Sequence, residues 1–227
     1  FIIDISNSKT IHMRNLLLPA MLAFSVLTSH GGTIKATTDS EAGTKVRILL
    51  NANSATSPIA IDWGNGQEVK YTVDPSQPAY NRWIEGTIEG PSMVISGNVT
   101  EAHLKELNFT SVEIEGMAYL KELDLSKNKL ATFDLKSITP LENLNLSNNQ
   151  LVNNTYERRT LSLEYAGETL STLNVGHNDG LICLDIRDLI SLKYFSANDC
   201  ASLGSVFICM PEDTRTELVN IDLSNCD

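Results

Sequence analysis

The sequence is poor in aromatic residues and in positive charge. Aromatic side chains make up only 6% of its 227 residues while 42% are hydrophobic, so a core must be built mainly from aliphatic side chains. Lysine and arginine number 17 against 28 aspartates and glutamates, which gives a net charge of −11. Phosphate backbones and anionic lipids are repelled by such a surface, which excludes nucleic acid as a partner and favours basic or neutral ones.

Signatures of catalysis are also missing. The chain has no G-x-S-x-G, H-E-x-x-H, P-loop or dinucleotide-binding fingerprint. Cysteine occurs only from Cys183 onward and never as C-x-x-C, which disfavours a thiolate zinc site. Of the four histidines, only His103 and His177 lie in the body of the chain, and neither belongs to such a motif. We therefore expect a non-enzymatic protein without a cofactor or metal.

Long apolar runs are absent, and the longest, Leu16 to Leu27, has 12 residues. A helix of that length is too short to cross a bilayer. It follows Met13 and a positive charge and precedes small polar residues, which is typical of a secretory leader, and Pro19 argues against the alternative of a core helix. We expect residues 1–31 to be an upstream extension plus a leader, and the mature chain to be secreted or on the cell surface without membrane insertion.

The strongest positive signal is one pattern that occurs twice. Leu120 to Leu130 and Leu141 to Leu151 both read L-x-x-L-x-L-x-x-N-x-L, the signature of a leucine-rich repeat. Side chains alternate in each short strand, so the leucines point inward and the polar residues outward. One unit has no core, so units must stack about 4.8 Å apart. The pattern predicts a mainly β solenoid with short parallel strands and irregular return arms.

Weaker copies extend the pattern in both directions. Copies start at Leu170, Leu192 and Leu218, and the last reaches Asp227 without its return arm, so we expect a solenoid truncated there. Residues 104–114 fit the apolar frame without the asparagine and predict a shortened first coil. The predicted solenoid spans residues 99–227 as five to six right-handed turns.

The pattern changes upstream of the repeats. Residues 32–44 are small and polar and predict a flexible linker. Within residues 45–98, Gly64-Asn65-Gly66 is a hairpin-type turn between short apolar runs. We predict a small antiparallel β cap that shields the first coil. Its expected strands are Val46–Leu50, Ile59–Trp63, Glu68–Thr72, Trp83–Ile88 and Met93–Ser96.

The asparagine position of the repeat predicts a structural ladder. An amide there can donate to and accept from backbone groups that the turn leaves unpaired. Two cysteines in successive copies would be within disulfide reach of each other, although two buried thiols are the favoured interpretation. The ladder residues are Asn128, Asn149, Asn178, Cys200 and Cys226.

The outward strand positions predict a flat, polar, concave sheet, which is the usual binding surface of such solenoids. Tyr194 is its one aromatic residue and the expected anchor, because aromatic residues dominate binding hot spots. In the first coil we expect the outward residues to be Glu106 and Asn108. The alternative is a solvated face with binding elsewhere. The predicted partner-binding residues are Glu122, Asp124, Asn143, Asn145, Thr172, Asn174, Tyr194, Ser196, Asn220 and Asp222.

These units resemble the leucine-rich repeats of bacterial internalin-like and BspA-like surface proteins. The resemblance lies in the L-x-x-L-x-L-x-x-N-x-L runs and in the spacing of Leu130, Phe133 and Leu135 that follows the first of them. It implies an exported, adhesin-like protein that binds a protein of a host or partner cell. The alternative is a glycan-binding module in which Trp83 or Tyr194 stacks on a sugar ring.

Overall fold

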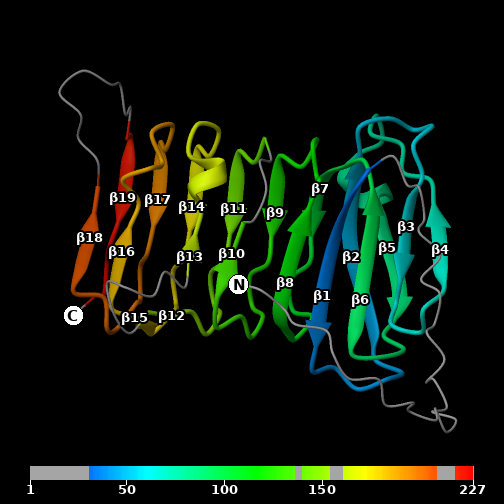
Figure 1. The fold of residues 1–227 in the computed structure, drawn as a ribbon, viewed down its shortest axis with the longest axis horizontal. Helices are drawn as coiled ribbons and strands as arrows, with labels where there is room; N and C mark the ends of the chain where they lie inside the picture. Colours follow the sequence, from blue (N-terminus) through cyan, green and yellow to red (C-terminus); the bar gives the residue numbers. More distant parts are fainter. Residues whose placement is uncertain (1–30, 136–139, 154–160, 209–217, 227) are drawn as a thin grey trace, which may run out of the picture.

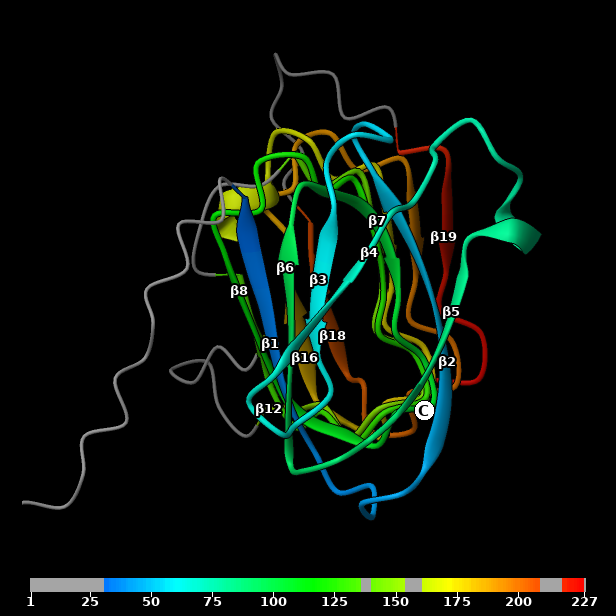
Figure 2. The same cartoon turned by 90° about the vertical axis from the view of Figure 1, so that its right-hand side faces the viewer.

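A computed structural model describes residues 31–135, 140–153, 161–208 and 218–226. The strands lie side by side along the longest axis of the molecule, with the N-terminal strands at one end and β19 near the other (Figure 1). In the view along that axis they form two walls of a flattened coil (Figure 2). The fold is mainly β, as predicted, with a solenoid of about five turns. The predicted extension and leader, residues 1–31, lie outside the described residues except for Gly31.

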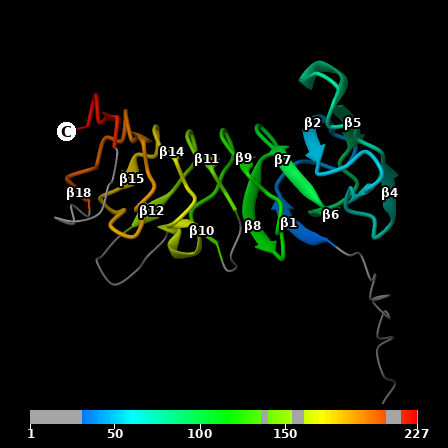
Figure 3. The same cartoon turned by 90° about the horizontal axis from the view of Figure 1, so that it is seen from above.

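The first wall is an eight-stranded sheet in the order β19-β17-β14-β11-β9-β7-β2-β5. From β7 to β19 neighbouring strands are parallel, and Leu123, Leu144, Leu173, Phe195 and Ile221 are aligned partners. This register confirms the predicted stacking of the coils. Figure 3 shows β7, β9, β11 and β14 following one another along the molecule. The parallel strands are β7 (Val99–His103), β9 (Glu122–Asp124), β11 (Asn143–Asn145), β14 (Thr172–Asn174), β17 (Tyr194–Ser196) and β19 (Asn220–Asp222).

The return arms of the coils form the opposite wall. Three parallel pairs are found there: β10 (Phe133–Asp134) with β13 (Leu161–Ser162), β12 (Val152–Asn153) with β15 (Gly180–Leu181), and β16 (Cys183–Asp185) with β18 (Ser205–Phe207). The helical elements of the described residues are two single 3-10 turns, η1 (Ala79–Asn81) and η2 (Glu164–Ala166). The described ranges therefore contain no helix that is long and apolar enough to span a membrane.

The N-terminal strands contribute to both walls. A five-stranded antiparallel sheet in the order β4-β3-β6-β1-β8 continues the return-arm wall, and two further N-terminal strands are the last two of the eight-stranded sheet. The first group is β1 (Gly32–Thr38), β3 (Ile59–Asp62), β4 (Glu68–Tyr71), β6 (Ser92–Gly97) and β8 (Phe109–Glu115). The second is β2 (Lys45–Ala52) and β5 (Trp83–Thr87).

The hairpin turn between β3 and β4 lies where the sequence predicts it. One carboxylate oxygen of Asp62 accepts hydrogen bonds from the amides of Gly64 and Gly66, at 2.9 and 3.0 Å. Both glycines have positive φ, 116° and 79°, which an L side chain would strain. The turn brings β3 and β4 into the antiparallel register in which Ile59 faces Tyr71.

The prediction of a flexible linker over residues 32–44 was wrong for its first half. Gly32–Thr38 forms β1, which pairs with β6 and β8 and buries Ile34 and Ala36. A Cβ atom on Gly32 would lie 2.3 Å from the carbonyl carbon of Gly116. Its small residues therefore permit a close approach of backbones, and composition alone does not distinguish this from flexibility.

The first coil starts at Val99, earlier than the predicted start at Leu104. Ala102 in β7 is the aligned partner of Leu123 in β9. The two residues are 21 positions apart, as are Leu123 and Leu144 of the complete copies. The repeat was predicted in the wrong frame because Val99 and Ala102 replace leucines and Leu107 occupies the asparagine position.

One continuous hydrophobic core joins the N-terminal strands β1–β6 to the coils that follow them. It extends from Ile34 in β1 to Leu203 in the late coils and includes buried side chains of both walls. Each large aliphatic or phenylalanine side chain buried there contributes about 1.5–3 kcal/mol of transfer free energy. A packed interior thus supports the eight-stranded sheet from β5 to β17, whereas Ile221 in β19 is 41% exposed.

Candidate recognition face

The outward side chains of β7, β9, β11, β14, β17 and β19 form two columns in register, called here the outer face. All ten predicted partner-binding residues are brought together on it, while their part in binding stays a prediction. One column is Glu101, Glu122, Asn143, Thr172, Tyr194 and Asn220. The other is His103, Asp124, Asn145, Asn174, Ser196 and Asp222.

The first coil supplies different residues to this face than the sequence predicted. Glu101 and His103 of β7 occupy the two columns, next to Glu122 and Asp124 of β9. The expected positions, Glu106 and Asn108, fall after the strand, and both have positive φ, 62° and 54°. The shifted frame of the first coil accounts for this error.

Tyr194 is the most exposed large apolar side chain of the outer face, with 49% of its surface accessible. Its aligned neighbours are Thr172 in β14 and Asn220 in β19. An aromatic ring between small polar neighbours on a hydrogen-bonded sheet has few conformations to lose when it binds. Such rings are favoured anchors of protein interfaces.

The second column has a structural role that the sequence analysis missed. In four coils its residue accepts a hydrogen bond from the backbone amide two positions later, an Asx turn that starts the bend after the strand. Asp222 receives a second bond from the Ser224 hydroxyl at 2.7 Å. Because the Ser224 hydroxyl and amide stabilise the carboxylate, they hold the pKa of Asp222 below its ordinary value. The four bonds join Asp124 to Ser126, Asn145 to Ser147, Asn174 to Gly176 and Asp222 to Ser224.

Each bend continues through one residue in the left-handed region. Asparagine, aspartate and histidine adopt this conformation at lower cost than other non-glycine residues, so the residue fits the turn in four of the five bends after β9, β11, β14, β17 and β19, and Lys127 is the exception. The left-handed residues are Lys127, Asn148, His177, Asp199 and Asn225, with φ of 57°, 54°, 55°, 55° and 59°.

The ladder residues follow directly and are bonded inside the coil. Asn128 donates from Nδ2 to the carbonyl oxygens of Leu104 and Leu125, both at 2.9 Å. Its Oδ1 accepts from the amides of Leu107 and Phe109, both at 3.0 Å. One buried side chain therefore satisfies backbone groups in two successive coils.

The two cysteines extend this ladder with weaker donors. The Cys200 thiol donates to the carbonyl of Val175 at 3.4 Å, and the Cys226 thiol donates to the carbonyl of Ala197 at 3.1 Å. Both are free thiols. Cys200 is fully buried, and that burial raises the pKa of its thiol.

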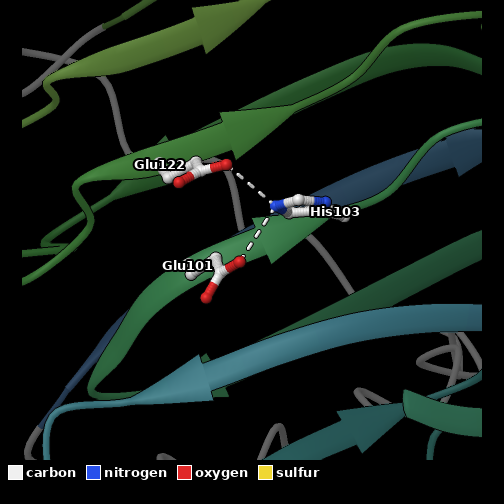
Figure 4. A group of neighbouring side chains, drawn as sticks. All are labelled: Glu101, His103 and Glu122. Atoms are coloured by element: carbon white, nitrogen blue, oxygen red, sulfur yellow. Dashed lines mark hydrogen bonds and ion pairs between the residues drawn. The ribbon is translucent and has the colours of Figure 1, made fainter. Parts of the chain in front are cut away.

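A charged cluster lies at the N-terminal end of the outer face. His103 Nε2 is 3.1 Å from Oε1 of Glu101 and 3.0 Å from Oε1 of Glu122 (Figure 4). Arg82 Nη1 lies 2.6 Å from Oε2 of Glu101. This cluster was not predicted from the sequence, although Glu101 and Glu122 are separated by the 21-residue period of the complete repeats.

Beyond this cluster the outer face continues into β2 and β5. Leu49 of β2 is the aligned partner of both His103 in β7 and Trp83 in β5. The second column therefore continues across β2 to the indole of Trp83. The Arg47 guanidinium lies over the Trp83 ring, 4.5 Å from its centroid, in cation–π geometry. One side of the ring is therefore already in contact with the protein.

Comparison with family models, curated proteins and solved structures gives no match to this chain.

Proposed function

We propose that the chain is an exported leucine-rich-repeat protein that binds a protein partner through the outer face, with the N-terminal strands acting as its cap. The repeat spelling and the in-register coils support the repeat assignment. The shared core with β1–β6 supports a capping role, because those strands cover apolar side chains of the first coil. Export follows from the leader-like sequence around Leu16 to Leu27.

The observation that carries the binding proposal is Tyr194, half exposed within a flat sheet of polar side chains in register. The face also has an acidic end, where Glu101, Glu122 and Asp124 are near neighbours. A basic or neutral protein surface complements this pattern.

Glycan binding, the alternative, has less support. A sugar stacks on an open aromatic face, and Arg47 already lies over the Trp83 ring. Binding to a glycan array that Trp83→Ala or Tyr194→Ala abolishes would favour the alternative.

The test uses proteins captured from the surface of candidate partner cells, whose affinity is then measured with purified components. We expect Tyr194→Ala to weaken the complex by about 2 kcal/mol, a loss of roughly 30-fold in affinity. Asn143→Arg should also block docking, because it adds a long charged side chain to the same column. Tyr165→Ala is the matched control, since Tyr165 is 44% exposed and lies in η2. Equal affinity of the Tyr194 and Tyr165 variants and of the Asn143 variant would refute the proposal.

A further inference from the structure

Three side chains with metal-binding atoms converge where β7 and β9 lie together. Nε2 of His103 lies 3.1 Å from Oε1 of Glu101 and 3.0 Å from Oε1 of Glu122. One ligand atom from each residue lies within 4.8 Å of the other two. Figure 4 shows the imidazole between the two carboxylates, with Glu101 and His103 on one strand and Glu122 on the next.

The imidazole nitrogen can make only one linear hydrogen bond. A ring nitrogen carries at most one hydrogen, and the contact of His103 Nε2 with Oε1 of Glu122 has hydrogen-bond geometry. The other oxygen then faces the nitrogen without a hydrogen between them. A divalent cation at this point would instead interact favourably with all three atoms.

The distances suit a transition metal. Zinc binds histidine nitrogen and carboxylate oxygen at about 2.0–2.2 Å, so neighbouring ligand atoms in a tetrahedral site are about 3.4 Å apart. The contacts at Nε2 need to widen by only a few tenths of an ångström to reach that spacing. An imidazole ligand favours zinc over calcium or magnesium, which prefer oxygen ligands alone.

The surroundings hold the ligands in place. Arg82 donates from Nη1 to Oε2 of Glu101, which leaves Oε1 of that carboxylate directed toward His103. An outer hydrogen bond of this kind orients a metal ligand. The side chains of Glu101 and His103 are 19% and 24% exposed, whereas Glu122 is 45% exposed, so the cluster is open to solvent on the β9 side.

We propose that Glu101, His103 and Glu122 bind one zinc ion. Each carboxylate supplies Oε1, the imidazole supplies Nε2 with its hydrogen on Nδ1, and water completes the coordination from the open side. The ion links β7 to β9 and so fastens the N-terminal strands to the first complete repeat. This site adds to the outer face and does not depend on the identity of a protein partner.

The test is a titration of the full chain with zinc by calorimetry, after removal of metal with EDTA and dialysis. We expect a site with one zinc per chain in the wild type, and a loss of at least about tenfold in its affinity in both His103→Gln and Glu122→Gln. His177→Gln and Glu142→Gln are matched controls and should keep the site. His177 also faces a carboxylate, with Nε2 at 3.5 Å from Asp199, and Glu142 pairs with Lys121.

Thermal unfolding gives a second readout. Zinc at 100 times its dissociation constant should multiply the folded-to-unfolded ratio about 100-fold in the wild type, and much less in Glu122→Gln. Glu122 is half exposed, so its glutamine variant should fold even if the histidine variant does not. The absence of wild-type binding, or equal zinc affinity in the Glu122 and Glu142 variants, would overturn the proposal. Magnesium binding as tight as zinc would overturn it too.

Discussion

Asn149 and Leu125 belong to successive coils and are joined by a hydrogen bond of 3.0 Å from the asparagine Nδ2 to the leucine carbonyl oxygen. The same amide also donates to the carbonyl of Leu146 in its own coil, at 2.9 Å. Asn178 repeats the relationship one coil later and donates to Leu146 at 3.0 Å. Each asparagine thus ties two coils together, and the carbonyls of Leu125 and Leu146 each accept from two asparagines.

Replacing Asn149 by alanine should destabilise the protein by about 2–3 kcal/mol. The Leu130 amide, which donates to Oδ1 of Asn149 at 3.0 Å, would lose its partner inside the coil. The two carbonyls would keep their bonds to Asn128 and Asn178. Chemical denaturation of the purified chain measures the change. Asn149→Cys should cost less than Asn149→Ala, because the sulfur is a weak acceptor for the Leu130 amide and the thiol also donates to the backbone, as Cys200 does. Equal losses in the two variants would count against the ladder.

Gly32→Ala should destabilise the protein by about 3 kcal/mol, in the range of an overpacked core. The added methyl would lie 2.3 Å from the carbonyl carbon of Gly116, so two backbones would have to separate. Gly204→Ala is the control, because its Cβ would meet only the Ile182 carbonyl oxygen at an ordinary 3.9 Å. Thermal unfolding of both variants decides the matter. If the two midpoints agree, Gly32–Thr38 does not form a central strand in solution.

The sequence predicts the solenoid well because its period is explicit. Leu123 and Leu144 repeat at the same place in two complete copies, and inward side chains spaced this way can be buried only by stacking. The alignment of Leu173 and Phe195 with them followed from the weaker copies. These predictions required no knowledge of distant contacts.

The features that were not predicted depend on contacts or turn geometry that the local sequence pattern does not reveal. β1 was not predicted because its small residues allow it to pack closely against β6 and β8, and both strands lie far along the chain from it. The Glu101–His103–Glu122 cluster was missed because Val99 and Ala102 disguise the first coil, which shifted the frame of its outward residues. In the second column, Asx turns were overlooked because the same side chains also fit a binding face.

The carboxyl of Asp222 should titrate below the ordinary aspartate value of about 3.9. Since the Ser224 hydroxyl and amide lower its pKa in the folded chain, its contribution to stability is present above that ordinary value. The contribution is lost as the pH falls through the lower folded pKa. NMR titration of the carboxyl carbon measures the folded pKa directly. Ser224→Ala should move the pKa of Asp222 upward, while Asp222→Asn should preserve the turn, as Asn145 does in its own coil. A pKa at or above the ordinary value would contradict the bonded turn.

The thiol of Cys200 should react slowly in the native protein and rapidly after unfolding. Burial raises its pKa, so at pH 8 a smaller fraction is thiolate, the form that attacks alkylating and disulfide reagents. Mass spectrometry of peptides labelled with iodoacetamide at pH 8 measures the rate at each cysteine. Cys226, which is only partly buried, should label faster than Cys200 in the folded chain.

The same experiment decides between the two states that the sequence leaves open for this pair. In guanidinium without a reductant, both Cys200 and Cys226 should label completely, because they are free thiols that donate to the carbonyls of Val175 and Ala197. A disulfide between them would protect both sites until a reductant is added. Protection of that kind in protein purified without a reductant would show that Cys200 and Cys226 are joined by a disulfide.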